Sequence, residues 1–214
     1  MSPDLLRALL GRVASGETPV ERALDDLVKL PFEDLGHARI DHHRRIRTGF
    51  PEAVWGEDKT PEQIADIVAR FSAVDELCLV TRVEADKAEA VLRRLGGSAD
   101  ARYEPAPRLL VQGQALSPRG RGPIAVVAAG TSDLPVAEEA GRTAELLGMT
   151  VERITDVGVA ALQRILAVRE RMEACEVVVV VAGMEGALPA VVKGLVSRPV
   201  IGVPTSVGAG AALE

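Results

Sequence analysis

The feature that most limits the fold of this chain is a regular alternation of aliphatic runs and helix-like stretches over residues 124–203. Helices are expected where apolar residues recur every three or four positions, and strands where short apolar runs end at turn residues. Strands separated by helices form a parallel sheet with helices on both faces, so we predict a doubly wound α/β fold. The predicted strands are 124–129, 150–155, 177–182 and 199–203, and the predicted helices are 134–147, 160–174 and 189–196.

Five consecutive valines at 177–181 carry no polar alternation. Such a run is typical of a central strand buried on both faces. The composition agrees, because 47% of the residues are hydrophobic and only 2% aromatic, so the core has to be built from Val, Leu, Ile and Ala. Cores of this kind suit parallel sheets covered by helices.

A smaller α/β region precedes this alternation. Its predicted elements are a helical hairpin in the first 30 residues, a helix at 61–73 capped by Thr60 and Gln63, a strand at 77–83, a helix at 84–95 and a strand at 108–111. Between 35 and 56 the chain is too rich in charge to be core, and we predict an exposed loop with a short strand. We therefore divide the chain into an N-terminal domain at 1–113, a linker at 114–123 and a second domain at 124–214.

The charge and cysteine content exclude several classes of protein. A net charge of −6 and a pI near 5.3 argue against nucleic-acid binding, which depends on Lys and Arg contacts with phosphates. Cys78 and Cys175 lie far apart without a CxxC pair, so we predict neither a disulfide framework nor a cysteine zinc site. No apolar stretch approaches the ~20 residues that span a bilayer, and Asp4 and Arg7 stand where a signal peptide would be apolar. We expect a soluble protein of the reducing cytoplasm, with no membrane partner.

In a doubly wound sheet the ligand binds beyond the carboxyl ends of the strands. This rule selects four loops, at 130–135, 156–159, 183–189 and 204–208. The first loop has no GxGxxG fingerprint, but Gly130 permits close backbone approach, and Thr131 and Ser132 offer hydroxyls. The start of the next helix offers free N–H groups to a phosphate. The alternative is that Ser132 or Asp133 only caps that helix.

The loop after the valine strand places Glu185 between two glycines, at 183 and 186. A carboxylate in this position is expected to be partly desolvated, which suits it to proton transfer near neutral pH. The alternative is a solvated acidic residue without a chemical role.

A charged segment of the first half holds His42 and His43 followed by several arginines. We predict no metal site here, because adjacent histidines on a strand point to opposite faces. The basic residues either form a solvated surface or, through Arg44 and Arg47, contact a phosphate. Trp55 either stacks on a flat heteroaromatic ring or belongs to a small satellite core.

Several segments taken together resemble a known family. Three segments resemble the PurE superfamily, whose members have a parallel sheet. They are GTSDLP at 130–135, GMEGALP at 183–189 and VIGVPTS at 200–206. Three segments of the first half resemble LarB proteins and not PurE mutases. They are DHHR at 41–44, RTGFPE at 47–52 and GEDKTP at 56–61. The resemblance covers nearly the whole chain and implies a PurE-like sheet domain behind a smaller LarB-type N-terminal domain.

The resemblance implies a reaction. LarB proteins take nicotinic acid adenine dinucleotide (NaAD), add a carboxyl group from CO2 or bicarbonate to the free meta carbon of the pyridinium ring, and split the phosphoanhydride to release AMP. The product, pyridinium-3,5-biscarboxylic acid mononucleotide, is the first intermediate of the nickel-pincer cofactor. The resemblance implies no tightly bound cofactor, leaves Mg²⁺ as an optional addition, and implies a homo-oligomer, which is an octamer among PurE relatives.

The resemblance also assigns residues. A cysteine thiolate is the family's nucleophile, and Glu185 is the candidate base that removes the ring proton. Asp156 and Gln163 complete the predicted catalytic set. The predicted substrate and phosphate contacts are Gly130, Thr131, Ser132, Asp133, Gly158, Gly183, Met184, Gly186, Thr205, Ser206, Asp41, Arg44, Arg47, Trp55 and Lys59.

Two positions depart from the family pattern. The family's cysteine follows a glycine-rich helix, whereas here Gly208 runs straight into Ala209, so we expect a truncated chain or an omitted stretch. Gln163 stands where the family has histidine, and Ala161 where it has glycine. A glutamine can hydrogen-bond to a carboxylate, but it cannot carry a proton near neutral pH as histidine does.

Two other functions stay open. A PurE-like mutase acting on carboxyaminoimidazole ribonucleotide would have Ala-His-Leu-Pro where this chain has GALP at 186–189. A nucleotide-binding scaffold would keep the phosphate loop and lack the thiolate.

Overall fold

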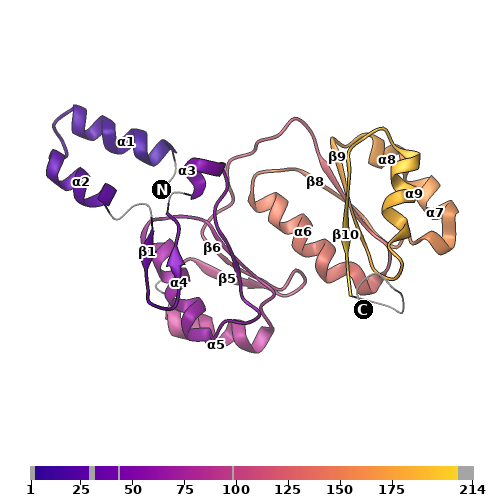
Figure 1. Cartoon of the computed structure of the whole chain (residues 1–214), viewed down its shortest axis with the longest axis horizontal. Helices are drawn as coiled ribbons and strands as arrows, with labels where there is room; N and C mark the ends of the chain where they lie inside the picture. Colours follow the sequence, from indigo (N-terminus) through magenta and orange to yellow (C-terminus); the bar gives the residue numbers. More distant parts are fainter. Residues whose placement is uncertain (1–2, 29–31, 43, 98, 207–214) are drawn as a thin grey trace. The chain divides into compact units, whose positions relative to one another are not determined.

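The computed structural model describes residues 3–28, 32–42, 44–97 and 99–206, and the chain forms two compact units (Figure 1). The first unit comprises Met1–Glu104 and Leu109–Gln114, and the second comprises Pro105–Arg108 and Ala115–Glu214.

The first unit is a four-stranded mixed sheet with helices. Its helices are α1 (Pro3–Ala14), α2 (Val20–Val28), α3 (Arg44–Thr48), α4 (Pro61–Ala73) and α5 (Ala85–Leu95). Its strands are β1 (Glu33–Asp34), β2 (Arg39–Ile40), β3 (Ala53–Trp55), β4 (Cys78–Thr81), β5 (Ala101–Glu104) and β6 (Leu109–Gln112). The sheet has the order β3-β4-β6-β5, in which β3 and β4 are parallel and the other pairs antiparallel. Helices α4 and α5 lie side by side and close the core (Figure 1).

Helix α4 has the predicted bounds because its first turn is capped as the sequence indicates. The Gln63 N–H donates to the Thr60 hydroxyl (3.3 Å), and the Thr60 N–H donates to the Gln63 side-chain oxygen (3.0 Å). Helix α5 ends at Gly96, whose φ of 56° is the left-handed conformation that glycine accepts readily. Strand β5 was not predicted.

The segment at 35–56 contains short strands, as predicted, but it is not the exposed loop that was expected. Ile40 and Val54 are 2% and 7% exposed and belong to the core of the first unit. His42 is also buried, with its ring against Phe71. The prediction was wrong because the charged residues between these apolar ones point outward and pair with one another, so a high charge content did not keep the backbone out of the core. Arg44 and Arg47 lie on helix α3 and not on a strand.

The second unit confirms the predicted parallel α/β sheet. Its strands are β7 (Ile124–Ala128), β8 (Val151–Ile154), β9 (Val177–Ala182) and β10 (Val200–Pro204). Its helices are α6 (Leu134–Leu146), α7 (Leu162–Ala167), α8 (Arg169–Glu173) and α9 (Ala187–Leu195), with short 3-10 turns η1 (Thr131–Asp133) and η2 (Val159–Ala161). The order is β10-β9-β7-β8 and every pair is parallel.

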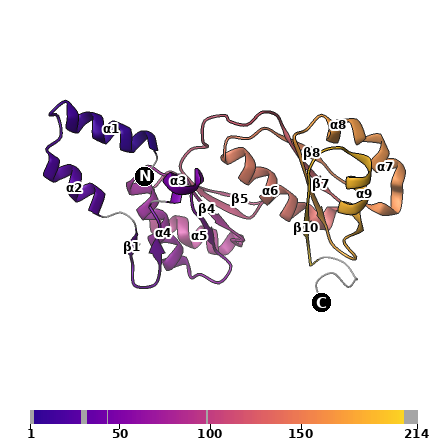
Figure 2. The ribbon, with the colours of Figure 1, turned by 45° about the horizontal axis from the view of Figure 1, so that its top comes forward.

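Helices cover both faces of this sheet, with α6 on one side and α7, α8 and α9 on the other (Figure 2). The valine strand β9 lies inside the sheet, and Val178, Val180 and Val181 have no exposed surface. The predicted single helix at 160–174 is divided into η2, α7 and α8. Ile165 and Met172, one from each helix, are fully buried, so the division keeps the apolar face toward the core.

Residues of the expected linker at 114–123 pack along the end of α6. The Leu116 N–H donates to the Leu146 carbonyl (2.8 Å), and the Arg119 N–H donates to the Gly148 carbonyl (2.7 Å). Gly148 has a φ of 85°, and a Cβ atom there would lie 2.3 Å from the Ser117 carbonyl oxygen. Only glycine fits this position.

Candidate functional site

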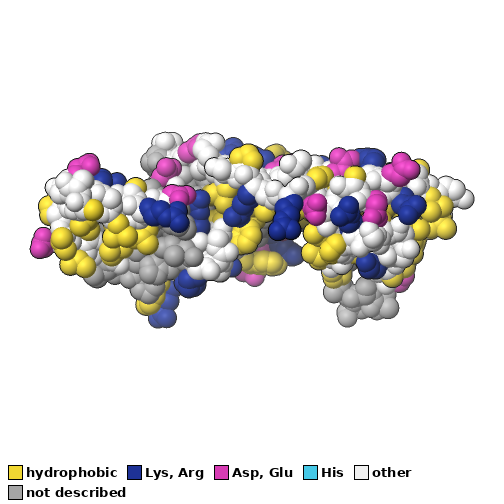
Figure 3. Space-filling model, turned by 90° about the horizontal axis from the view of Figure 1, so that it is seen from above, with side chains coloured by type: hydrophobic (Ala, Val, Ile, Leu, Met, Phe, Trp, Pro, Cys, Tyr) yellow, Lys and Arg dark blue, Asp and Glu magenta, His cyan; other side chains and the backbone are white. Residues whose placement is uncertain are grey.

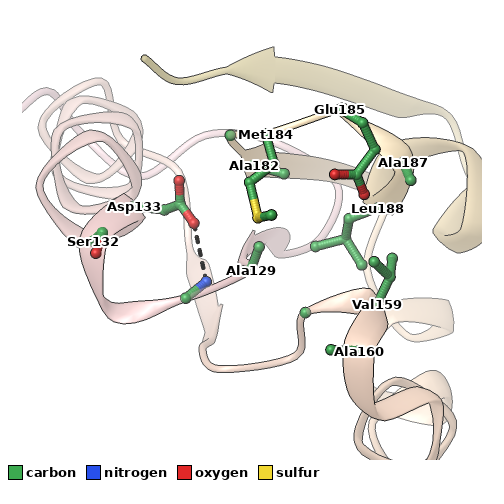
Figure 4. Close-up of a pocket in the computed structure, with 13 residues that line it drawn as sticks. Ala129, Ser132, Asp133, Val159, Ala160, Ala182, Met184, Glu185, Ala187 and Leu188 are labelled. Carbon is green, nitrogen blue, oxygen red and sulfur yellow. Dashed lines mark hydrogen bonds between the residues drawn. The ribbon is translucent and has the colours of Figure 1, made fainter. Parts of the chain in front are cut away.

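A pocket of about 400 Å³ opens at the carboxyl ends of β7, β8 and β9. From β7 the chain continues outward to β8 and then returns to β9 on the other side, so the pocket lies where the strand order reverses. Its size falls within the range of small-ligand sites. The lining residues are Ala129, Gly130, Ser132, Asp133, Gly158, Val159, Ala160, Ala182, Gly183, Met184, Glu185, Ala187 and Leu188 (Figure 4).

The carboxylate of Asp133 is used by the protein itself. It is 6% exposed, and one oxygen accepts the Gly130 N–H (3.0 Å; dashed line in Figure 4) while the other accepts the Thr205 hydroxyl (2.6 Å). The Thr205 N–H donates to the Ala182 carbonyl (3.1 Å). Asp133 therefore ties the loop after β7 to the loop after β10, and its side chain makes no capping hydrogen bond to α6. Thr205 is buried and Ser206 exposed, and neither belongs to the lining.

Gly130 and Ser132 of the first loop also line the pocket. Gly130 has an extended backbone, and a Cβ atom there would meet only Asp133, at 3.7 Å. The protein alone does not require glycine at this position, and close approach of a ligand would. Thr131 and Ser132 are both exposed, and of the two only Ser132 lines the pocket. The first N–H groups of a helix, here in η1, have no acceptor within the helix.

The loop after β9 is held in an uncommon conformation. Met184 has a φ of 56° and Gly186 a φ of 67°, and the Gly186 N–H donates to the Gly183 carbonyl (3.1 Å). A non-glycine residue at positive φ stores strain, which is often found at functional sites. Figure 4 shows the Met184 and Glu185 side chains on the same loop at the rim of the pocket, with Leu188 beside them.

Glu185 is exposed in the second unit, so the predicted desolvation of its carboxylate is wrong. The carboxylate follows the buried strand β9 through Met184, which has a positive φ and is itself exposed. The lining includes two carboxylates, of Asp133 and Glu185, and among the described lining residues none is lysine or arginine. An anionic ligand would have to be held by backbone N–H groups or by a cation from outside this lining.

Two predicted catalytic residues lie away from the pocket lining. Asp156 and Gln163 are exposed, and the Asp156 carboxylate forms an ion pair with Arg164 (2.5 Å). Gly158, from the same connection, does line the pocket, and a Cβ atom there would lie 3.1 Å from the Ala129 carbonyl oxygen. Val159 and Leu188 belong to the loops selected from the sequence, but the apolar wall that they form with Ala160 was not predicted. Its only sequence signal is that it directly follows turn residues at strand ends.

The substrate contacts predicted in the first unit interact with other residues of that unit or line a second pocket. Arg47 is bidentate to Asp41 (3.1 and 2.6 Å), and this hydrogen bonding raises the pKa of the Arg47 guanidinium. Arg44 is exposed. His42 lies 3.3 Å from a Glu33 carboxylate oxygen, whereas His43 lies outside the described residues. Trp55 and Lys59 line a second pocket, of about 270 Å³.

Neither cysteine is accessible enough to act as a nucleophile. Cys78 is buried in β4, where desolvation, reinforced by Glu52 and Glu76, raises the pKa of its thiol. Cys175 is 1% exposed, burial raises its pKa, and its thiol donates to the Arg171 carbonyl (3.3 Å). Both thiols therefore stay protonated and unreactive near neutral pH.

Other kinds of site were sought in the described part of the chain. Its His, Cys, Asp and Glu residues form no group of three or more that could hold a metal ion. None of its helices combines the length and the hydropathy needed to cross a bilayer. Over the second unit, Figure 3 shows acidic and basic side chains interspersed on the face drawn.

Comparison with known proteins identifies both units. Residues 32–114 match the LarB/PurE-like N-terminal domain, and residues 123–213 match AIR carboxylase, which indicates a carboxylase-type enzyme with a PurE-like fold. The uncharacterized protein MJ0165 of Methanocaldococcus jannaschii is 34% identical over 212 residues, an alignment that covers 96% of this chain and 82% of that protein. The second unit has its pocket at the switch point of a parallel sheet. Together with the two domain matches in this order, this shows that the chain belongs to the LarB family of the PurE-like superfamily.

Proposed function

We propose that this protein carboxylates NaAD at C5 of its pyridinium ring with CO2 or bicarbonate, and hydrolyses the phosphoanhydride to give pyridinium-3,5-biscarboxylic acid mononucleotide and AMP. The observation that carries the proposal is the combination of a LarB-type N-terminal domain with an AIR carboxylase domain whose pocket has a carboxylate at its rim. A PurE mutase reading does not account for the first domain.

The chemistry constrains what the pocket must do. A pyridinium ring is electron-poor and does not attack CO2, so a nucleophile has to add to the ring first and convert it to a neutral enamine. Carbon C5 then forms the new bond to CO2, a base takes the C5 proton, and loss of the nucleophile restores the pyridinium. In the net exchange a carboxylate replaces one ring hydrogen, and the proton leaves with the base.

Glu185 is the proposed base, and the apolar wall of Val159, Ala160 and Leu188 would hold the ring beside it. Ser132 and the first N–H groups of η1 would contact a phosphate of the dinucleotide. Because the described lining has no basic side chain, we include Mg²⁺ as a proposed counter-charge for the phosphoanhydride.

The nucleophile is the group that these residues do not supply. Cys78 and Cys175 are the two cysteines of the sequence, and both are buried away from the pocket. The thiolate would therefore come from outside this sequence or from a small thiol. The same observation favours a second candidate function, a nucleotide-binding scaffold that binds NaAD without turnover.

The test is to incubate the protein with NaAD, labelled bicarbonate and Mg²⁺, with and without a small thiol, and to follow products by mass spectrometry. We expect label in a dicarboxylated mononucleotide together with AMP, at a rate that rises with thiol. The Glu185→Gln variant should lose about 100-fold or more of this rate, the usual contribution of a positioned base, and Glu170→Gln on the exposed surface of α8 is the matched control. Binding of NaAD without product under all conditions would support the scaffold, and isomerisation of carboxyaminoimidazole ribonucleotide would support the mutase.

A further inference from the structure

The second pocket lies wholly within the first unit and combines three kinds of surface. Its floor consists of apolar side chains that belong to the core, those of Ile40, Val54, Ile67 and Phe71. One wall is Trp55, and the polar residues of the lining are His37, Arg39, Glu52 and Lys59. An apolar floor, an aromatic wall and a rim with two cations, Lys59 and the Asp34-paired Arg39, suit a heteroaromatic ring that carries a phosphate.

Trp55 is fixed in place although it is 45% exposed. It ends β3 opposite Thr81 of the parallel strand β4, so Arg82 lies next to it at the same edge of the sheet. The Arg82 guanidinium carbon is 4.2 Å from the Trp55 ring centroid, and Arg82 also pairs with Glu57 (3.4 Å). The Arg82 backbone has a φ of 54°, a strained conformation for a non-glycine residue.

The backbone after Trp55 is held by two further contacts. Lys87 donates to the carbonyls of Gly56 (3.0 Å) and Glu57 (2.6 Å). Gly56 has no room for a Cβ atom, which would lie 2.8 Å from the Thr81 carbonyl oxygen. An exposed indole held this firmly is preorganised for stacking on a flat ring.

The charge on Arg82 decides which ring fits. Arg82 does not belong to the pocket lining, although its guanidinium carbon lies 4.2 Å from the Trp55 ring centroid. A guanidinium on one face already engages the π-electrons of the indole, and a second cation against the other face would be repelled by the first. A neutral purine meets no such repulsion, whereas a pyridinium ring does.

We propose that the Trp55 pocket binds the adenylate class of nucleotide, with the purine on the indole, the phosphate at Lys59 and Arg39, and Arg82 as a positioning residue. The choice of adenine over other neutral purines rests on the proposed function, which releases AMP. The site itself stands on the geometry of the first unit.

Trp55 is the only tryptophan of the chain, so its fluorescence reports on this pocket alone. Titration of the full chain with AMP should quench the emission saturably, whereas nicotinic acid mononucleotide or inorganic phosphate alone should not reproduce it. Equal affinity for nicotinic acid mononucleotide would overturn the purine assignment, and absence of any saturable response to AMP would overturn the site.

Two variants separate stacking from folding. Arg82→Gly removes the guanidinium and relieves the backbone strain, so it should fold normally and bind AMP about two- to fivefold more weakly, the effect of an exposed cation–π contact. Arg108→Gly makes the same exchange at a φ of 49°, in the turn before β6, and should bind AMP as the parent does. Unchanged AMP affinity in Arg82→Gly would contradict the positioning role.

Trp55→Ala should weaken AMP binding at least about fivefold by equilibrium dialysis, since base–aromatic stacking has that magnitude. Glu185→Gln should leave AMP binding unchanged while removing turnover of NaAD. AMP binding without any NaAD turnover would leave this site standing and the proposed reaction refuted. Turnover of NaAD without AMP binding at Trp55 would support the proposed reaction and refute this site.

Discussion

At the scale of single residues, Asp133 shows how a polar side chain near a pocket can serve the fold. Its two oxygens accept from the Gly130 N–H in a partly buried setting and from the Thr205 hydroxyl in a buried one. Asp133→Ala would leave these donors unsatisfied and should lower the free energy of unfolding by about 2 kcal/mol or more. Urea denaturation measures this, with Ser132→Ala as a control that should change little. Unchanged stability of Asp133→Ala with lost nucleotide binding would instead mean that the carboxylate acts on the ligand.

At the scale of elements, the contact between α6 and β8 depends on ion pairs. Arg153 of β8 hydrogen-bonds to Glu138 (3.0 Å) and to Glu145 of α6. The hydrogen bond from Arg153 lowers the pKa of Glu145 below its usual range. A lowered folded-state pKa gives stability that is present above the unfolded-state pKa and is lost as the pH falls through the folded one.

We therefore expect the stability of the second unit to decline below about pH 4.5, the ordinary value for a glutamate. Glu145→Gln should flatten this part of the profile, measured as urea midpoints between pH 3 and 6, and Glu170→Gln on α8 of the same unit is the control. If both variants keep the parent's slope, Glu145 does not contribute to it. The effect should be small, because the pair is partly exposed and screened by salt.

The elements show which structural features are visible in local sequence. Helix α4 and strand β9 have their predicted bounds, because a capping box and an unbroken valine run act over neighbouring residues. Strand β5 was missed although Ala101 and Tyr103 alternate with charged residues, because the run is only four residues long and all four are half-buried. The strand edge that carries the pocket, with Gly130, Gly158 and Glu185, was predictable from the order of elements. The bond between Asp133 and Thr205 joins residues 72 positions apart, and no local pattern announces it.

At the scale of the whole molecule, each unit closes a core of its own. Ile165 is fully buried in the second unit, whereas Trp55 belongs to the first. Ile165→Ala should cost the second unit about 2–5 kcal/mol. In urea, the far-ultraviolet circular dichroism should then show an early transition, while the Trp55 emission keeps its parent midpoint. A joint shift of both signals would mean that the units unfold together.

The fit between Gly148 and the Ser117 carbonyl bears on how this protein can be dissected. A fragment that begins at Ile124, where the sheet begins, would lack Leu116 and Arg119. The carbonyls of Leu146 and Gly148 would then lose their backbone donors, and the end of α6 would be exposed to water. The natural place to cut is before Ala115. Residues 115–123, which the sequence suggests are a linker, belong to the second unit, and a fragment of that unit would need them to remain folded.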